Sequence, residues 1–198
     1  MKKKLLIYTV LYMSYISFSP SELMSQISYP KSYIIWNDTT KLKISDFRSM
    51  NKGKGSIKAL SYIGFNYKIS LDGDSVIKII LNDYFDKHKS WMLKDYQNEY
   101  TRAHENGHFD IGEIYARMIR KEITEEKITK KNYSKKVEKI YQKNKTLMEN
   151  EQKQYDEETG HSVNKEMQEK WIQDINQRLL QLENYKKDTI IIRIKKVM

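Results

Sequence analysis

The segment from His104 to His108 reads His-Glu-Asn-Gly-His, and it is the feature that most constrains the fold of this 198-residue chain. On an α-helix, residues four positions apart lie about 40° apart around the axis and about 6 Å apart along it. Two histidines at this spacing can therefore hold one metal ion, and Glu105 lies close enough to act on a water molecule there. The segment consequently predicts a helix, together with a fold that brings a further ligand to it.

The sequence around this motif is typical of a long helix. Between about Met92 and Ile123 there is no proline, and apolar and site residues recur at helical spacing. Two further helices are predicted, over about 134 to 155 and from about Val163 to Tyr185. Gly160 lies in the interruption between them and is typical of a helix end.

The first half of the chain is predicted to form strands. Strands followed by helices indicate an α+β protein rather than alternating βαβ units. We predict a zincin-like fold, in which a small N-terminal antiparallel or mixed sheet precedes the metal-binding helix and two further helices. A sheet edge beside the metal would be able to pair with an extended peptide. The predicted strands are 32–36, 41–44, 59–70, 75–85 and, at the C-terminus, 189–194.

The N-terminus has the pattern of a secretory signal. Three lysines at positions 2–4 precede an uncharged, mostly apolar run over 5–18. This run is shorter than the roughly 20 residues that a membrane-spanning helix needs. We predict a signal peptide over 1–25, cleaved after Ser25, with an uncleaved membrane anchor as the alternative. Residues 26–198 are then predicted to form a single domain, located in the periplasm or secreted.

Composition narrows the possible chemistry. The chain contains no cysteine, so a bound metal must be held by histidine and carboxylate side chains. The formal net charge is +10, but the lysines are spread along the chain and interleaved with acidic and apolar residues. No nucleic-acid-binding motif occurs, and nucleic acid is not an expected partner. A hydrophobic fraction of 39% is sufficient for a core, which excludes a disordered chain.

A catalytic zinc ion usually has three protein ligands and a water molecule, so a third ligand must come from elsewhere in the chain. Asp110 and Glu113 are rotated about 240° and about 180° from His104 on the helix, which disfavours both. Glu122 returns to the same phase but lies about 27 Å away along the axis. The acidic residues 125–126 follow the helix in a lysine-rich stretch that is typical of a loop.

The segment Tyr-Asp-Glu-Glu-Thr-Gly-His, which ends at His161, offers a better third ligand. It lies at the break between the two later helices, far enough downstream for the chain to fold back over the motif. We predict His161 as the third ligand, with Asp156 as the alternative ligand or as the hydrogen-bond partner of a ligating imidazole. Tyr155 is predicted to donate its hydroxyl to the oxyanion that forms during hydrolysis.

Two motifs of the chain resemble those of an uncharacterised bacterial domain family, whose members are described as predicted secreted zinc-dependent proteases. The first begins at His104 and reads HENGHFDIGEIYAR, and the second reads YDEETGH and ends at His161. The resemblance covers most of the chain after the signal segment. It implies that His104 and His108 are metal ligands, that Glu105 is the general base and that His161 is the third ligand.

These observations predict an exported zinc metallopeptidase that binds one zinc ion and hydrolyses peptide or protein substrates. Contact with a membrane is expected only through the signal segment. One alternative is a secreted or cell-envelope binding protein in which the zinc ion is purely structural. Another is a basic module whose lysine-rich face binds anionic polymers of the cell surface, in which case binding would weaken with salt.

Overall fold

The computed structural model describes residues 29–50, 57–73 and 75–194. The predicted signal segment, residues 1–25, lies outside these ranges. The described residues from 31 onward belong to one compact unit. None of the helices in this part of the chain has the length and apolar character needed to cross a membrane.

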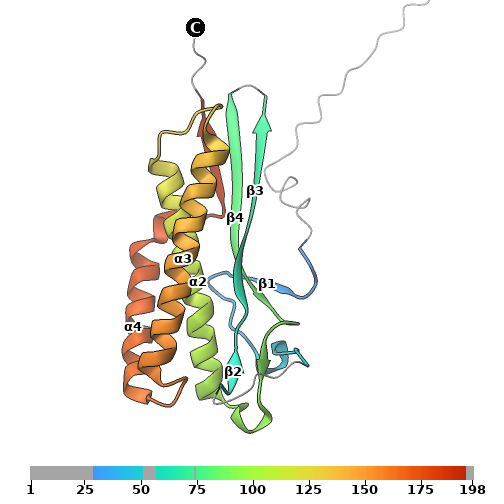
Figure 1. Ribbon diagram of the computed structural model, residues 1–198, viewed down its shortest axis with the longest axis vertical. Coiled ribbons are helices and arrows are strands. Elements are labelled where there is room, and N and C mark those ends of the chain that lie inside the picture. Colours follow the sequence, from blue (N-terminus) through green and yellow to red (C-terminus); the bar gives the residue numbers. More distant parts are fainter. Residues whose placement is uncertain (1–28, 51–56, 74, 195–198) are drawn as a thin grey trace, which may run out of the picture. The chain divides into compact units, whose positions relative to one another are not determined.

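The described chain has a mixed α+β architecture, in which three α-helices pack together beside antiparallel strands, as predicted (Figure 1). The helices are α2 (Glu99–Glu125), α3 (Tyr133–Thr159) and α4 (Lys165–Gln181). The strands are β1 (Tyr33–Ile35), β2 (Ala59–Leu60), β3 (Ile63–Asp72), β4 (Val76–Asp86), β5 (Trp91–Met92) and β6 (Thr189–Arg193). Three short 3-10 helices are η1 (Ile44–Asp46), η2 (Lys94–Tyr96) and η3 (Glu183–Tyr185). Helix α2 contacts the sheet as well as α3 and α4, so it lies at the centre of the molecule.

Strand β4 is the central strand of the main sheet. Strand β3 pairs with it along nearly its whole length, and β1 and β6 pair with the two ends of its other side. Within the described residues no further strand pairs with β3, which is therefore an edge strand. Strands β2 and β5 form a separate two-stranded sheet next to the start of β3.

The core lies between β4 and α2. Because side chains alternate along a strand, every second residue of β4 points toward the helix. Ile77, Ile79 and Leu81 are fully buried there and belong to one cluster with Ile111 and Ile114 of α2. Full burial of each such side chain contributes about 1.5–3 kcal/mol relative to exposure. This apolar contact holds α2, which carries the His-Glu-x-x-His motif, against the sheet.

Helix α2 begins later than the sequence pattern predicts. It starts at Glu99 rather than near Met92, because Asn98 caps it by accepting a hydrogen bond from the backbone N–H of Thr101 at 2.9 Å. Met92 instead pairs with β2 as part of β5. The sequence between the two positions forms the short helix η2 and contains no proline or glycine that would have marked the boundary.

Two predicted strands also differ in the structure. Residues 41–44 do not form a strand, because Leu42 is drawn into a buried aromatic cluster and η1 follows. The predicted strand 59–70 is divided into β2 and β3. At the division the backbone N–H of Tyr62 donates to the hydroxyl of Ser90 at 2.9 Å instead of to a neighbouring strand. The other predicted helices and the C-terminal strand are present with small shifts of their ends.

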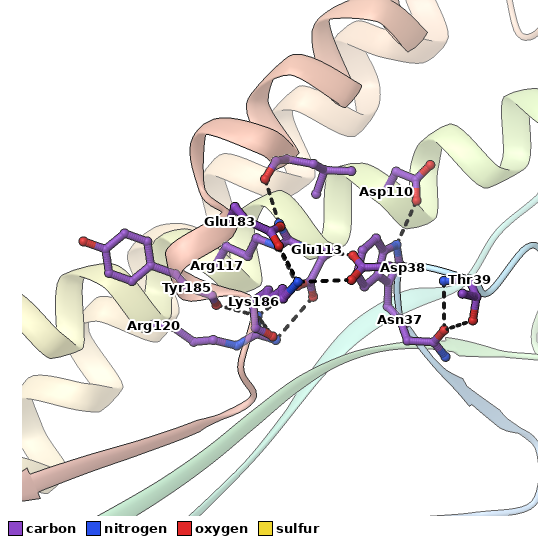
Figure 2. Close-up of polar contacts among 12 residues, drawn as sticks. Asn37, Asp38, Thr39, Asp110, Glu113, Arg117, Arg120, Glu183, Tyr185 and Lys186 are labelled. Carbon is purple, nitrogen blue, oxygen red and sulfur yellow. Dashed lines mark hydrogen bonds and ion pairs between the residues drawn. The ribbon is translucent and has the colours of Figure 1, made fainter.

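A buried ion-pair network fixes α2 against both the sheet and α4 (Figure 2). Glu113 accepts hydrogen bonds from Nε of Arg117 and from Nη1 of Arg120, each at 2.9 Å. Arg120 also donates to the backbone oxygen of Leu81 on β4 at 3.0 Å, and Arg117 donates to that of Leu179 on α4 at 2.7 Å. Both guanidinium groups are buried, so the loss of one partner would leave an uncompensated charge. The network therefore restricts rotation of α2 about its axis.

Asp83 is a buried carboxyl group of β4 beside this network. A Cβ atom on Gly112 of α2 would lie 2.6 Å from one of its oxygens, so only glycine allows the strand and helix to approach this closely. No group in the described part of the chain forms a hydrogen bond with either carboxyl oxygen. Burial, together with the nearby charge of Glu113, raises the pKa of Asp83 well above its ordinary value.

We expect the substitution Asp83→Asn to change the pH dependence of stability. Because folding raises the pKa of Asp83, its contribution to stability is fully present below the unfolded value of about 3.9 and is lost as pH rises toward the folded value. Between about pH 3 and about pH 7, the free energy of unfolding of the variant should therefore rise relative to that of wild type. The rise should be about 1.4 kcal/mol for each unit by which folding raises the pKa of Asp83 within that window. Urea denaturation across this range measures the difference, and a difference that does not change with pH would contradict the expectation.

Candidate metal centre

The two histidines of the His-Glu-x-x-His motif lie together on the side of α2 that faces α3. The Nε2 atoms of His104 and His108 are 3.2 Å apart, at the spacing that the motif predicts for one helix face. Both residues are buried, and their rings meet edge to face with centroids 4.8 Å apart. Two ring nitrogens that point at one position, away from bulk water, are a suitable pair of metal ligands.

Asp156 of α3 supplies a third donor atom. Its Oδ1 lies 3.1 Å from Nε2 of His104 and 3.1 Å from Nε2 of His108. Around a four-coordinate zinc ion, with bonds of about 2.0–2.1 Å, the donor atoms lie about 3.3–3.4 Å apart. The three side chains therefore form a compact group that could hold a metal ion.

Gln152, one turn before Asp156 on α3, selects the form of His108 that can bind a metal. Nδ1–H of His108 donates to Oε1 of Gln152, and Nε2 of Gln152 donates to the backbone oxygen of His108 at 2.9 Å. With the proton on Nδ1, the lone pair of Nε2 points into the donor group. The negative charge of the Asp156 carboxylate repels this lone pair. A cation between the carboxylate and Nε2 would be attracted by both. The donor set thus fits a metal cation.

Without a metal, a proton takes the place of the cation. Burial lowers the pKa of His108, but hydrogen bonding to Asp156 and the charges of nearby carboxylates outweigh it and raise the pKa to about 9. Burial lowers the pKa of His104 to about 4, despite the opposing effect of the same carboxylate. Burial alone would raise the pKa of Asp156, but its hydrogen bonds to both histidines hold it well below its usual range. The group therefore carries one imidazolium and one carboxylate at neutral pH.

Glu105 lies beside the donor group and is almost fully buried. The hydroxyl of Ser61, in the connection between β2 and β3, donates to Oε2 of Glu105 at 2.7 Å. Burial raises the pKa of Glu105 above its ordinary value, while the charge of His108 and the hydrogen bond from Ser61 act against it. A raised pKa brings a carboxylate closer to the range in which it works as a general base near neutral pH.

Sequence reasoning missed Ser61 and Gln152, although both contact the motif directly. A single serine in a strand region and a single glutamine in a lysine-rich helix carry no signal of their own. Helical phase offers a signal for Gln152, because Gln152 lies four residues before Asp156 and therefore shares the same face of the helix. No comparable signal exists for Ser61, because only the tertiary structure brings the β2–β3 connection to α2.

Tyr155 does not have the position that its predicted role as an oxyanion donor requires. Its side chain is fully buried, and its hydroxyl donates to the backbone oxygen of His104 at 3.3 Å. Its ring stacks on the imidazole of His104, with centroids 4.6 Å apart and planes 17° apart. A Cβ atom on Gly107 would lie 2.5 Å from the hydroxyl oxygen. The hydroxyl is enclosed between two helices, so Tyr155 positions His104 rather than facing a substrate.

His161, the predicted third ligand, lies at the margin of the donor group. Its Nδ1 is 3.3 Å from Oδ1 of Asp156, and 42% of its side chain is exposed. The compact donor group contains Asp156, the predicted alternative, and not His161. Asp156 lies in the last turn of α3 and faces α2, whereas His161 follows the left-handed Gly160 that ends the helix, and itself has a φ of 51°. The position of His161 beside Asp156 fits a hydrogen-bond partner of this carboxylate.

A groove of about 530 Å³ opens beside the donor group. His108 and Asp156 lie in its lining, together with the connection from β2 into β3 and one face of α3. Ser61, which contacts Glu105, also lines this groove. A molecule bound in the groove would therefore lie next to both the donor group and the residue that holds Glu105.

Comparison with known proteins relates part of the chain to a bacterial family. A family model described as a bacterial protein of unknown function (DUF922) matches residues 85–162. This segment contains the whole His-Glu-x-x-His motif and the segment from Tyr155 to His161, so the chain is similar to a bacterial family of unknown function over the residues of the donor group. No curated protein and no solved structure matches the chain.

The tight contact between Gly107 and Tyr155 yields a test of how the two helices pack. Gly107→Ala should lower the free energy of unfolding of the metal-free protein by up to about 2 kcal/mol, since overpacking costs about 1–3 kcal/mol and the higher helix propensity of alanine returns about 1 kcal/mol. Adding Tyr155→Phe removes the atom that the new methyl group would meet first. Chemical denaturation should then show that the double variant loses less free energy of unfolding than the sum of the losses in the two single variants. Strictly additive effects would contradict the contact.

Proposed function

We propose that this protein is an exported zinc-dependent metallopeptidase with a zincin-like fold. The observation that carries the proposal is the group of His104, His108 and Asp156 at an open groove, next to the buried carboxylate of Glu105. Two imidazole nitrogens and one carboxylate oxygen, with a fourth position left for water, are typical of catalytic rather than structural zinc. The signal pattern over residues 1–25 supports export.

The residues of the chain have distinct parts in the proposed reaction. When bound, zinc supplies Lewis-acid chemistry, which polarises a peptide carbonyl and makes a water molecule easier to deprotonate. Glu105 takes a proton from this water as its oxygen adds to the carbonyl carbon, and then gives the proton to the amine as the C–N bond breaks. Ser61 holds one oxygen of the Glu105 carboxylate by a hydrogen bond and so fixes the orientation of this base. Gln152 accepts a hydrogen bond from Nδ1–H of His108, so Nε2 is the nitrogen of this ring that would bind the ion.

The alternative is a binding protein in which a zinc ion only braces α2 against α3. Bracing requires the three donor side chains but has no need for a buried carboxylate held by a serine hydroxyl, or for a groove beside the metal. Burying Glu105 costs stability, as its raised pKa indicates, and a purely structural site would gain nothing from that cost. These features favour catalysis.

The ligand set can be tested by metal affinity. We expect Asp156→Ala to weaken zinc binding by more than about 100-fold, whereas His161→Ala should weaken it by about tenfold, as is typical of a residue that only orients a ligand. Competition with a chromophoric zinc chelator measures both affinities. His88→Ala is the matched control, because His88 is exposed and does not belong to the donor group. A loss for His161→Ala as large as that for Asp156→Ala would make His161 a ligand after all.

The mechanism can be tested at Glu105. Glu105→Gln preserves the size and hydrogen-bonding reach of the side chain but removes the base, so zinc should stay bound while hydrolysis falls by about 10²–10⁴-fold. Hydrolysis of a pool of quenched fluorescent peptides, together with zinc content, measures both effects. In the wild-type protein a chelator should abolish hydrolysis and added zinc should restore it. Persistent hydrolysis by the variant would exclude the proposed mechanism, and zinc-dependent stability without any hydrolysis would favour the bracing alternative.

A further inference from the structure

The groove beside His108 follows the edge of a strand. Successive residues from Ala59 to Phe65 all line it, whereas only alternate residues would line a groove on the face of a sheet. Strand β3 pairs with β4 on one side, and its other side has no partner strand in the described part of the chain. An unpaired strand edge presents backbone N–H and C=O groups that can pair with an extended peptide.

The opposite wall of the groove is one face of α3. The residues of α3 that line it run from Tyr141 to Asp156, a length of about 22 Å at 1.5 Å per residue. An extended peptide rises about 3.4 Å per residue, so about six residues would fill this length. Because Asp156 belongs to the donor group, the metal site lies at one end of the groove. The groove therefore suits one flank of a bound peptide, with the reacting bond at its end.

The part of the groove farther from the metal site is apolar and aromatic. Phe65 and Met148 are 7% and 4% exposed and line it between β3 and α3. The ring of Tyr141 meets that of Phe65 edge-on, with centroids 6.1 Å apart. Ile63 and Tyr141 are half-buried and leave part of their apolar surface open to the groove. A large apolar side chain placed here would remove this surface from water together with its own.

The rim of the groove on α3 is charged. Nζ of Lys145 lies 3.7 Å from a carboxylate oxygen of Glu149, so these two charges offset each other. Lys153 is exposed and also lines the groove, and it forms no ion pair with the described residues. It directly follows Gln152, which contacts His108, so its unpaired charge lies toward the metal end. A positive charge at this place attracts an acidic residue of a peptide and repels a basic one.

We propose that the groove between β3 and α3 binds an extended peptide, with a large apolar or aromatic side chain held between Phe65, Tyr141 and Met148. Nearer the metal, Lys153 selects an acidic over a basic residue. The inference rests on the proposed peptidase function and names its class of substrate. The apolar residue and the acidic residue of the peptide lie on the same side of the reacting bond, a few residues apart. This follows because the groove extends from one end of the donor group.

The first test uses the zinc-loaded protein and an unbiased peptide library whose cleavage sites are read by mass spectrometry. Large apolar residues should be enriched at one position within about six residues of the cleaved bond, and lysine and arginine should be depleted at a position nearer to it. Lys153→Glu should replace the acidic preference by a basic one, with a change of about tenfold at that position. Lys139→Glu, the same charge change on α3 outside the groove, should leave the profile unaltered.

The second test measures binding without catalysis. Zinc-loaded Glu105→Gln is titrated with labelled alanine heptapeptides that carry one phenylalanine at successive positions. One position should bind about tenfold more tightly than the all-alanine peptide, as expected for one buried apolar side chain. Equal binding of all peptides, or cleavage by wild type with no apolar preference, would overturn the inference and leave the peptidase proposal intact. Selective binding with no cleavage by wild type would refute the peptidase function and leave the groove as a peptide-binding site.

Discussion

The contact between Tyr155 and Gly107 determines how closely α3 approaches α2, and the candidate metal site depends on that approach. Because residue 107 has no side chain, the ring of Tyr155 lies against the backbone of α2 and stacks on His104. The next residue, Asp156, is thereby brought within 3.1 Å of both imidazoles. Two imidazoles and a carboxylate at these distances, largely removed from water, require a proton or a cation between them. The packing of one aromatic ring thus creates a site that favours positive charge.

The side of α2 away from this site is held just as firmly. Glu113 joins Arg117 and Arg120 in a buried network that reaches the backbone of both β4 and α4. One turn closer to the motif, Asp110 accepts hydrogen bonds from Trp36 and Asn106 at 2.8 Å each. These polar contacts orient the helix more specifically than apolar packing alone, because each needs one particular rotation of α2. Functional side chains on an element held in this way keep their geometry before any ligand binds.

The predictions from sequence were most accurate where one element was considered at a time. The long helix, the adjacency of His104 and His108, the strong strand β4 and the C-terminal strand all follow from periodicity within a continuous segment. The phases that disfavoured Asp110 and Glu113 as ligands also agree with the structure, where both take part in other buried contacts. Helical phase is a local property, and the residues that share a face can be counted without knowing the fold.

The sequence was least informative about the relation between elements. The segment from Tyr155 to His161 lies beside the motif, but the arrangement of its side chains there depends on how α3 is rotated against α2. That rotation directs Tyr155 into the space above Gly107, places Asp156 in the donor group and leaves His161 beyond the helix end. The contact of Ser61 with Glu105 and the groove along β3 had no sequence signal either, because both form where a strand edge meets two helices.

By itself, the sequence determined a helix that carries two histidines and a glutamate, an absence of cysteine that limits ligands to imidazole and carboxylate, and an order of strands before helices. The tertiary structure alone decided which carboxylate joins the histidines, which hydroxyl holds Glu105 and where a ligand could enter. The physical reason is that backbone periodicity is encoded by neighbouring residues. The distance and rotation between packed elements, in contrast, are decided by contacts such as that of Tyr155 with Gly107, whose partners are far apart in the chain.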